Sequence, residues 1–144
     1  MKKINQTATK IFFKLIEKMG TETHLKLNVP EYISLVIEQI GEGIITPYGK
    51  AKLYSLAHYY TLQGDAMRDP EMCFIVVDNR VHKDDWEMVG IYPQMFQQDD
   101  VGLYEESICI KDNTVTTYKP KWQAGHTRFA NIWLQNIRQQ GFLK

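Results

Sequence analysis

Between residues 23 and 120 the chain is a succession of apolar, β-branched runs separated by short, turn-forming segments. Parallel strands require crossover connections of about a dozen residues or more, usually containing a helix. These connections are too short for that, so we expect the strands to pair antiparallel and exclude a doubly wound parallel sheet.

The pattern predicts about six strands, because residues rich in Gly, Asp, Asn and Pro separate the runs. The expected turns include 41–49, the loop 63–70 and the hairpin turn 111–113, and Pro93 is expected to end a strand. One run, 50–62, also fits a helix, but its flanking turns favour a strand. The expected strands are 32–40, 50–62, 71–77, 86–92, 103–110 and 114–118.

Both ends of this region adjoin segments with helical periodicity. Residues 3–19 are predicted to form an amphipathic helix that ends at Gly20, a typical C-cap residue. A second helix is expected to begin near Thr127 and to end at Gly141. Its apolar stripe comprises Phe129, Ala130, Trp133, Leu134 and Ile137.

The 144 residues match the usual size of one domain. We therefore expect a single α+β domain spanning residues 1–144. Its two layers would be a curved antiparallel sheet of about six strands and the N- and C-terminal helices packed on one face. The other face would be exposed to water or serve as an interface.

The cysteines and the apolar segments indicate a cytoplasmic protein. Cys73 and Cys109 each lie in an apolar run, which is typical of small buried side chains and not of a disulfide framework or a metal site. Lys and Glu interrupt the N-terminal apolar residues, unlike a secretory signal. No stretch approaches the roughly 18 apolar residues that a membrane span needs.

The formal net charge is zero, but it is unevenly distributed. Residues 1–60 carry eight Lys and five Glu (+3), and residues 61–112 carry twelve acidic and four basic residues (−8). Residues 113–144 carry five basic residues and no acidic one (+5). Because duplex binding normally requires a basic balance, nucleic-acid binding is a minor hypothesis that would use the C-terminal segment.

A first candidate site lies around the loop 63–70. His58 and Tyr60 precede it, and it leads through Asp65, Arg68 and Asp69 to Glu71. An imidazole beside three carboxylates could serve acid–base chemistry or hold a metal ion if the groups converged, with His58 as base or ligand. The alternative is a loop ordered by an ion pair of Arg68 with a carboxylate and by Asp side chains bonded to backbone amides.

A second candidate stretch mixes amides, acids and an aromatic side chain between two expected strands. It runs from Phe96 to Glu106, and its candidate binding residues are Gln97, Gln98, Asp99, Tyr104 and Glu105. Such a stretch either lines a binding groove or solvates a loop and the outer face of a strand. The four histidines show no ligand spacing, and nucleophile, phosphate-loop and dinucleotide motifs are absent. We therefore expect no metal and no cofactor.

Three strings of residues resemble a known family. They are 57–60 with 63–65 and 67–72; 96–99 with Gly102, Tyr104 and Glu105; and 129–137. On these strings nearly the whole chain resembles an uncharacterised family of small bacterial domains found among accessory genes of conjugative elements and phages. The resemblance implies an accessory protein and no catalytic activity.

We therefore expect a non-enzymatic interaction module with a protein partner, anchored by Arg68 and Tyr104, because Arg and Tyr contribute disproportionately to binding. One alternative is a small hydrolase or nucleic-acid-modifying enzyme that uses the first candidate cluster. Another is a nucleic-acid accessory protein. A homodimer through the free sheet face is a further expectation.

Overall fold

Two helices flank eight strands in the computed structural model, which describes all 144 residues. Two 3₁₀ turns, η1 and η2, adjoin the fifth strand. In chain order the elements are α1 (Gln6–Met19), β1 (His24–Leu27), β2 (Ser34–Thr46), β3 (Gly49–Leu62), β4 (Asp65–Asp78), η1 (Trp86–Met88), β5 (Val89–Gln98), η2 (Asp99–Val101), β6 (Leu103–Glu106), β7 (Ile108–Lys111), β8 (Thr114–Tyr118) and α2 (Pro120–Gln139).

Local capping determines where the helices begin and end. The side chain of Asn5 accepts a hydrogen bond of 2.8 Å from the Ala8 amide, so α1 begins later than the predicted residue 3. Gly20 ends α1 with φ of 59°, as expected from its C-cap position. α2 begins at Pro120, not near Thr127, because proline fits the first helical position, where no amide donor is needed.

The strands form one mostly antiparallel sheet in the order β6-β5-β4-β3-β2-β8-β7, with β1 paired to β2. The exception is the parallel pairing of β2 with β8 at Ile45 and Thr114. The sheet therefore has eight strands where about six were expected. β1 was missed because it is only four residues long, and the expected strand 103–110 divides at Ser107 into β6 and β7.

Two expected turns are shorter than predicted and the expected strand end at Pro93 is wrong, because bulges allow strands to continue through turn-forming residues. β2 extends to Thr46 through two register shifts around Gly41. The expected loop 63–70 is reduced to Gln63 and Gly64, which have φ of 51° and 87°. Pro93 lies within β5 at a register shift, where a residue without an amide donor is tolerated. Residues 86–88, expected to begin a strand, form η1 instead.

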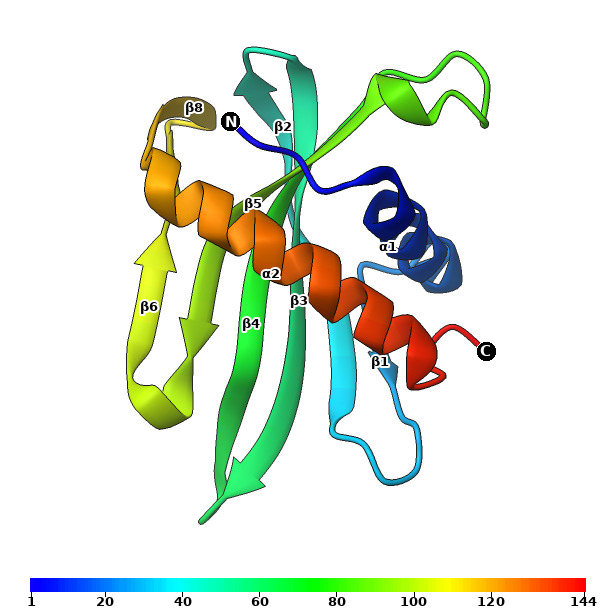
Figure 1. Ribbon diagram of the computed structural model, residues 1–144, viewed down its shortest axis with the longest axis vertical. Helices are drawn as coiled ribbons and strands as arrows, with labels where there is room; N and C mark the ends of the chain where they lie inside the picture. The colour runs from blue at the N-terminus through cyan, green and yellow to red at the C-terminus, as the bar shows by residue number, and fades with distance from the viewer.

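Both helices pack on the same face of the sheet, as expected (Figure 1). The main core lies between them and the strands. Phe12 of α1 is fully buried at its centre, with its ring centroid 4.9 Å from that of Phe74 and 5.8 Å from that of Tyr54. From α2, Trp133, Leu134 and other apolar residues complete this layer. The fold is therefore α+β with helices on one face.

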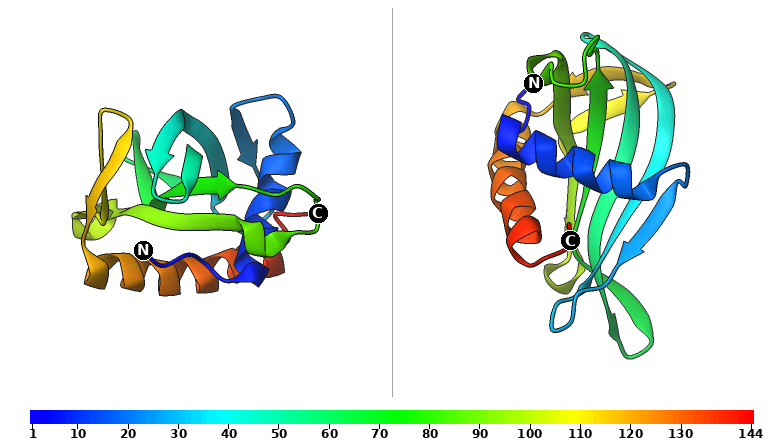
Figure 2. Two further views of the ribbon diagram at one scale, coloured as in Figure 1. Left: turned by 90° about the horizontal axis from the view of Figure 1, so that it is seen from above. Right: turned by 90° about the vertical axis from the view of Figure 1, so that its right-hand side faces the viewer.

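The opposite face of the sheet is covered only at one end. Figure 2 shows the β7–β8 hairpin rising from the sheet on the side away from the helices. Ile108 from this hairpin packs with Ile75, Val77 and Tyr92 in a second, smaller apolar cluster. No helix of the protein is long and apolar enough to cross a membrane.

Candidate functional site

The strand register places two rows of side chains across six strands on the face away from the helices. Side chains alternate between the two faces of a strand, so residues two apart in each strand share this face. One row consists of His24, Glu38, Ser55, Cys73, Met95 and Glu106. The next row consists of Lys26, Val36, Ala57, Glu71, Gln97 and Tyr104. We call these rows, with the paired Tyr59 and Arg68, the open face.

Arg68 is held in place at the edge of the open face by two carboxylates. Asp99 accepts hydrogen bonds of 2.9 Å from both the backbone amide and the Nε of Arg68. The Nη1 atom of Arg68 lies 3.6 Å from the Glu71 carboxylate. The hydrogen bond between the side chains raises the pKa of Arg68 and lowers that of Asp99. Asp99 therefore fixes η2 against β4.

Glu71 also links β4 to β3, because it accepts a hydrogen bond of 2.5 Å from the Ser55 hydroxyl. Cys73 is buried between these side chains and Glu106. Burial, together with the Glu71 and Glu106 carboxylates, raises the pKa of the Cys73 thiol to about 12. The nucleophile in cysteine chemistry is the thiolate, so this thiol is unreactive at neutral pH.

Two tyrosines frame the acidic part of the open face. Tyr104 is 56% exposed, and its hydroxyl donates a hydrogen bond of 3.3 Å to Glu106. Burial and Glu106 raise the pKa of Tyr104, and burial and Glu71 raise that of Tyr59. Both tyrosines are therefore neutral hydroxyl donors beside carboxylates at physiological pH.

The open face carries carboxylates that have no ion-pair partner. Within 4.0 Å, Glu71 contacts Arg68, but Glu38 and Glu106 contact no cationic side chain. A hollow of about 470 Å³ adjoins Glu38 and is also lined by Lys26 and Tyr59. The face therefore offers unpaired carboxylates on β2 and on edge strand β6, together with the exposed ring of Tyr104, to a cationic group.

The two stretches singled out in the sequence lie against each other. Arg68 bonds to Asp99, and the Gln98 amide donates a hydrogen bond of 3.0 Å to Asp69. Gln97 and Tyr104 pair across β5 and β6. The structure thus joins Arg68, Asp69 and Glu71 with the stretch that begins at Gln97.

His58 lies on the other face, beneath α2 and the C-terminal residues. Its ring centroid is 5.7 Å from that of Trp133 and 5.6 Å from that of Phe142. Its Nδ1 atom lies 3.1 Å from the Ile33 carbonyl oxygen and 3.3 Å from that of Ser34. Burial lowers the pKa of His58. These surroundings are those of a neutral core histidine.

The four residues of the enzyme hypothesis therefore do not converge. Ala57 pairs with Glu71, so Glu71 faces away from its near neighbour His58. Asp65 is exposed at the β3–β4 turn, opposite Leu62. Tyr60 pairs with Met67, two residues along from His58 on the helix side of β3. The sequence could not reveal this separation, because it depends on the register between strands.

Glu105, another predicted binding residue, belongs to a separate network beneath α2. His126 lies between Ser107 and Glu105, at 3.0 Å from Nδ1 to the serine hydroxyl and 2.9 Å from Nε2 to the carboxylate. This arrangement resembles a catalytic triad, but Ser107 is 1% exposed and lies within hydrogen-bonding distance of the Pro93 and Gln94 carbonyl oxygens. The hydroxyl cannot reach a substrate, so the network links α2 to the sheet.

The sequence hypothesis missed several residues of the open face, including Ser55, Glu38 and Tyr59. The two-residue alternation in the strands places Ser55 with Tyr59, and Tyr104 with Glu106, which ends the second candidate stretch. No three His, Cys, Asp or Glu side chains are grouped to hold a metal ion.

Comparison with known proteins places the chain in a family. No curated protein and no solved structure matches it. A family match, described as "Domain of unknown function (DUF6908)", covers residues 6–143. Because this match covers almost the whole fold, the chain belongs to the DUF6908 family of domains of unknown function.

Proposed function

We propose that the protein is a binding module and that its open face recognises a protein segment with basic side chains. The observation that carries this proposal is a continuous row of side chains across six strands that neither helix covers. Exposed tyrosine, fixed arginine and carboxylates along such a row offer the mixed contacts that protein interfaces use.

The charges of the open face favour a cationic partner. Glu38 and Glu106 lack an ion-pair partner, whereas Arg68 is already engaged by Asp99 and Glu71. A Lys or Arg side chain of the partner would gain charge-assisted hydrogen bonds from Glu106 while its stem packs on the ring of Tyr104. Arg68 and Tyr104 remain the proposed anchors, Arg68 through its exposed part (37% of the side chain).

A binding role agrees better with this site than a catalytic one. The Cys73 thiol is held protonated, and His58 lies on the opposite face from Glu71. The resemblance to accessory proteins of conjugative elements and phages suggests that the partner is another bacterial protein encoded by, or acting on, such an element. That context belongs to the proposal.

Site-specific photo-crosslinking in bacterial cells tests the proposal. A benzophenone amino acid replaces Tyr104 on the open face, and the matched control replaces Ile132, which is 65% exposed on α2. We expect a discrete protein adduct from position 104 and none from position 132. Equal labelling from both positions, or none from either, would refute the binding surface. An adduct of twice the protein's own mass would identify a second copy as the partner.

Charge reversal tests which chemistry the partner carries. Glu106→Lys should abolish the adduct from position 104, because it places a cation against the expected basic side chain. Glu22→Lys is the matched control, since Glu22 is exposed and forms no ion pair. If Glu106→Lys leaves the adduct unchanged, the partner is not recognised through its positive charge.

A further inference from the structure

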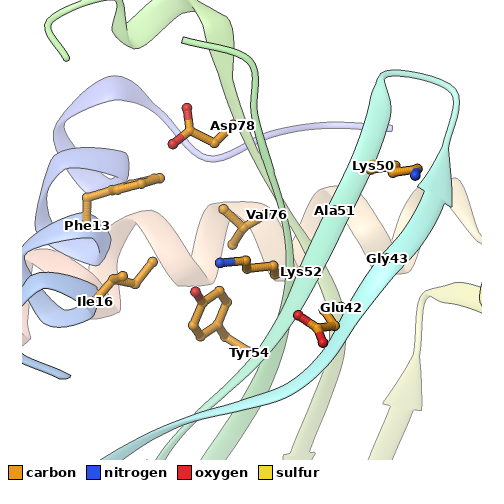
Figure 3. Close-up of a pocket in the computed structure, with 10 residues that line it drawn as sticks. All are labelled: Phe13, Ile16, Glu42, Gly43, Lys50, Ala51, Lys52, Tyr54, Val76 and Asp78. Carbon is orange, nitrogen blue, oxygen red and sulfur yellow. The ribbon is translucent and has the colours of Figure 1, made fainter. Parts of the chain in front are cut away.

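A second concave site lies on the helix side of the sheet, away from the open face. It is a pocket of about 360 Å³ between α1 and the upper parts of β2, β3 and β4. Figure 3 shows its lining side chains, which include Phe13 and Ile16 from α1. Pockets of 300–1,000 Å³ are typical of small-molecule sites. We call it the α1 pocket.

Its walls are mostly apolar. Phe13 and Ile16 form the wall on the helix side, and the ring of Tyr54 with Val76 forms the wall on the sheet side. Phe13, Tyr54 and Val76 belong to the main core, and Ile16 packs against it. A bound apolar group would therefore extend the core instead of lying on a mobile surface.

Two hydrogen-bond donors at this pocket have no partner in the protein. Tyr54 is only 4% exposed, yet its hydroxyl makes no hydrogen bond, and it points into the pocket in Figure 3. Lys52 on the same strand forms no ion pair, and its amino group lies on the same side as this hydroxyl. Burial raises the pKa of Tyr54, so the hydroxyl keeps its proton at neutral pH. The Tyr54 hydroxyl is not among the buried polar atoms without a partner, so it opens into the pocket, where water or a ligand accepts its hydrogen bond.

Two carboxylates, those of Asp78 and Glu42, also line the pocket, and Asp78 interacts with Lys52 as well as with Arg80. Asp78 is bound by Arg80 through two hydrogen bonds of 2.9 Å, and its pKa is lowered by them. The Arg80 guanidinium also lies 4.6 Å from the centre of the Phe13 ring. Glu42 lines the sheet side of the pocket without an ion-pair partner, and the amino group of Lys50 points away from the Tyr54 hydroxyl.

We propose that the α1 pocket binds a small amphiphilic carboxylate, with its apolar body against α1 and its carboxylate on Tyr54 and Lys52. The carboxylate accepts a hydrogen bond from the Tyr54 hydroxyl and a charge-assisted one from the Lys52 ammonium group. The apolar body displaces water from the wall formed by Phe13, Ile16 and Val76.

Chemical-shift titration by NMR with 4-phenylbutyrate tests the site, and 4-phenylbutan-1-ol serves as the matched uncharged probe. We expect saturable shifts centred on Ile16, Tyr54 and Val76 with the carboxylate, and binding of the alcohol weaker by roughly tenfold or more. Equal binding of the two probes overturns the proposed carboxylate site, as does the absence of shifts at these residues.

Two variants test the contributions of the Lys52 and Tyr54 donors to binding separately. Lys52→Gln should weaken phenylbutyrate binding roughly tenfold, and Tyr54→Phe should weaken it about fivefold, because each removes one donor. Lys121→Gln, at an exposed lysine of α2 outside the pocket, is the matched control and should bind as the unaltered protein does. Dispersed amide spectra establish that each variant is folded. Undiminished binding by folded Lys52→Gln and Tyr54→Phe variants overturns the assignment of the donors.

The proposal for the α1 pocket and the proposal for the open face can be refuted independently of each other. The α1 pocket and the open face lie on opposite sides of the sheet, so Glu106→Lys should leave phenylbutyrate binding unchanged. Loss of phenylbutyrate binding in that variant would overturn the α1 pocket as an independent site.

Discussion

Asp99 holds the two candidate stretches together, so its replacement should lower the free energy of unfolding by a measurable amount. Its Oδ2 atom accepts from both the backbone amide and the Nε of Arg68, each at 2.9 Å. Asp99→Ala removes both bonds, whereas Asp99→Asn keeps an oxygen for the amide and removes the charge. Arg68→Met removes the side-chain donor and keeps the backbone bond.

The expected magnitudes follow from the exposure of the pair. Hydrogen bonds to charged groups contribute about 1.5–3 kcal/mol when buried, but the Arg68 side chain is 37% exposed, so solvent screens the charge. We expect the free energy of unfolding to fall by about 1.5 kcal/mol in Asp99→Ala. In Asp99→Asn and in Arg68→Met it should fall by about 0.5 kcal/mol.

Urea denaturation followed by circular dichroism measures these differences, with Asp100→Asn, an exposed neighbour without a hydrogen-bonding role, as the control. For a domain of this size about 1 kcal/mol corresponds to about 4 °C in Tm. Because the pKa of Asp99 is lowered in the folded state, its contribution is full above the unfolded pKa of about 3.9 and is lost as the pH falls through the folded value. The difference between Asp99→Ala and the unaltered protein should therefore be constant from about pH 5 to 8.

Two results would refute this reasoning. If Asp99→Ala and Arg68→Met destabilise equally, the backbone bond contributes nothing and Asp99 is only a surface ion pair. If the Asp99→Ala difference changes across the neutral range, a group other than the Asp99 carboxylate is responsible.

The remaining predictions concern the core, the thiols, pH and nucleic acid. Phe12→Ala should destabilise the fold by about 3–5 kcal/mol in urea denaturation, because the ring is fully buried against Phe74, and a loss below 1 kcal/mol would contradict this packing. Ellman's reagent should modify exposed Cys109 rapidly and Cys73 only after unfolding. Rapid modification of both thiols in the folded protein would contradict the burial of Cys73. Burial lowers the pKa of His58, so its neutral form favours folding above the unfolded pKa of about 6.5 and stability falls as the pH drops below it. His58→Gln should flatten this pH dependence of stability between about pH 5 and 7.5. If the variant keeps the same dependence, a group other than His58 is responsible for it. A fluorescent single-stranded oligonucleotide should show no anisotropy change at low salt, whereas binding that weakens steeply with salt would favour the nucleic-acid alternative.

Local chemistry explains which elements could be predicted. The 3.6-residue period of α1 and its terminal glycine act within a few turns of the chain, and both are visible in the sequence. Alternating and β-branched runs likewise revealed β3 and the buried part of β4. Strand ends at Thr46 and Asp65 were less predictable, because bulges let paired neighbours carry a strand through residues that favour turns.

The composition of the candidate site was only partly predictable for a related reason. Arg68 and Asp99 are separated by 31 residues, and their contact depends on how β4, β5 and η2 pack. The sequence indicated that both stretches are polar and rich in acidic residues. It did not indicate which carboxylate would form the ion pair with Arg68. Ser55 became a site residue only through its pairing with Cys73 across the strands.

The sequence by itself determined the class of the fold: terminal amphipathic helices, and strands whose short connections require antiparallel pairing. Tertiary structure decided which side chains share a face. A one-residue register shift between Ala57 and Tyr59 changes the pairing along β3 and β4, with Glu71 opposite Ala57 and Arg68 opposite Tyr59. Because side chains alternate with a period of two, Glu71 opposite Ala57 lies on the face away from His58, and the shifted residue in β4 places Arg68, and not Asp69, on the face of Glu71.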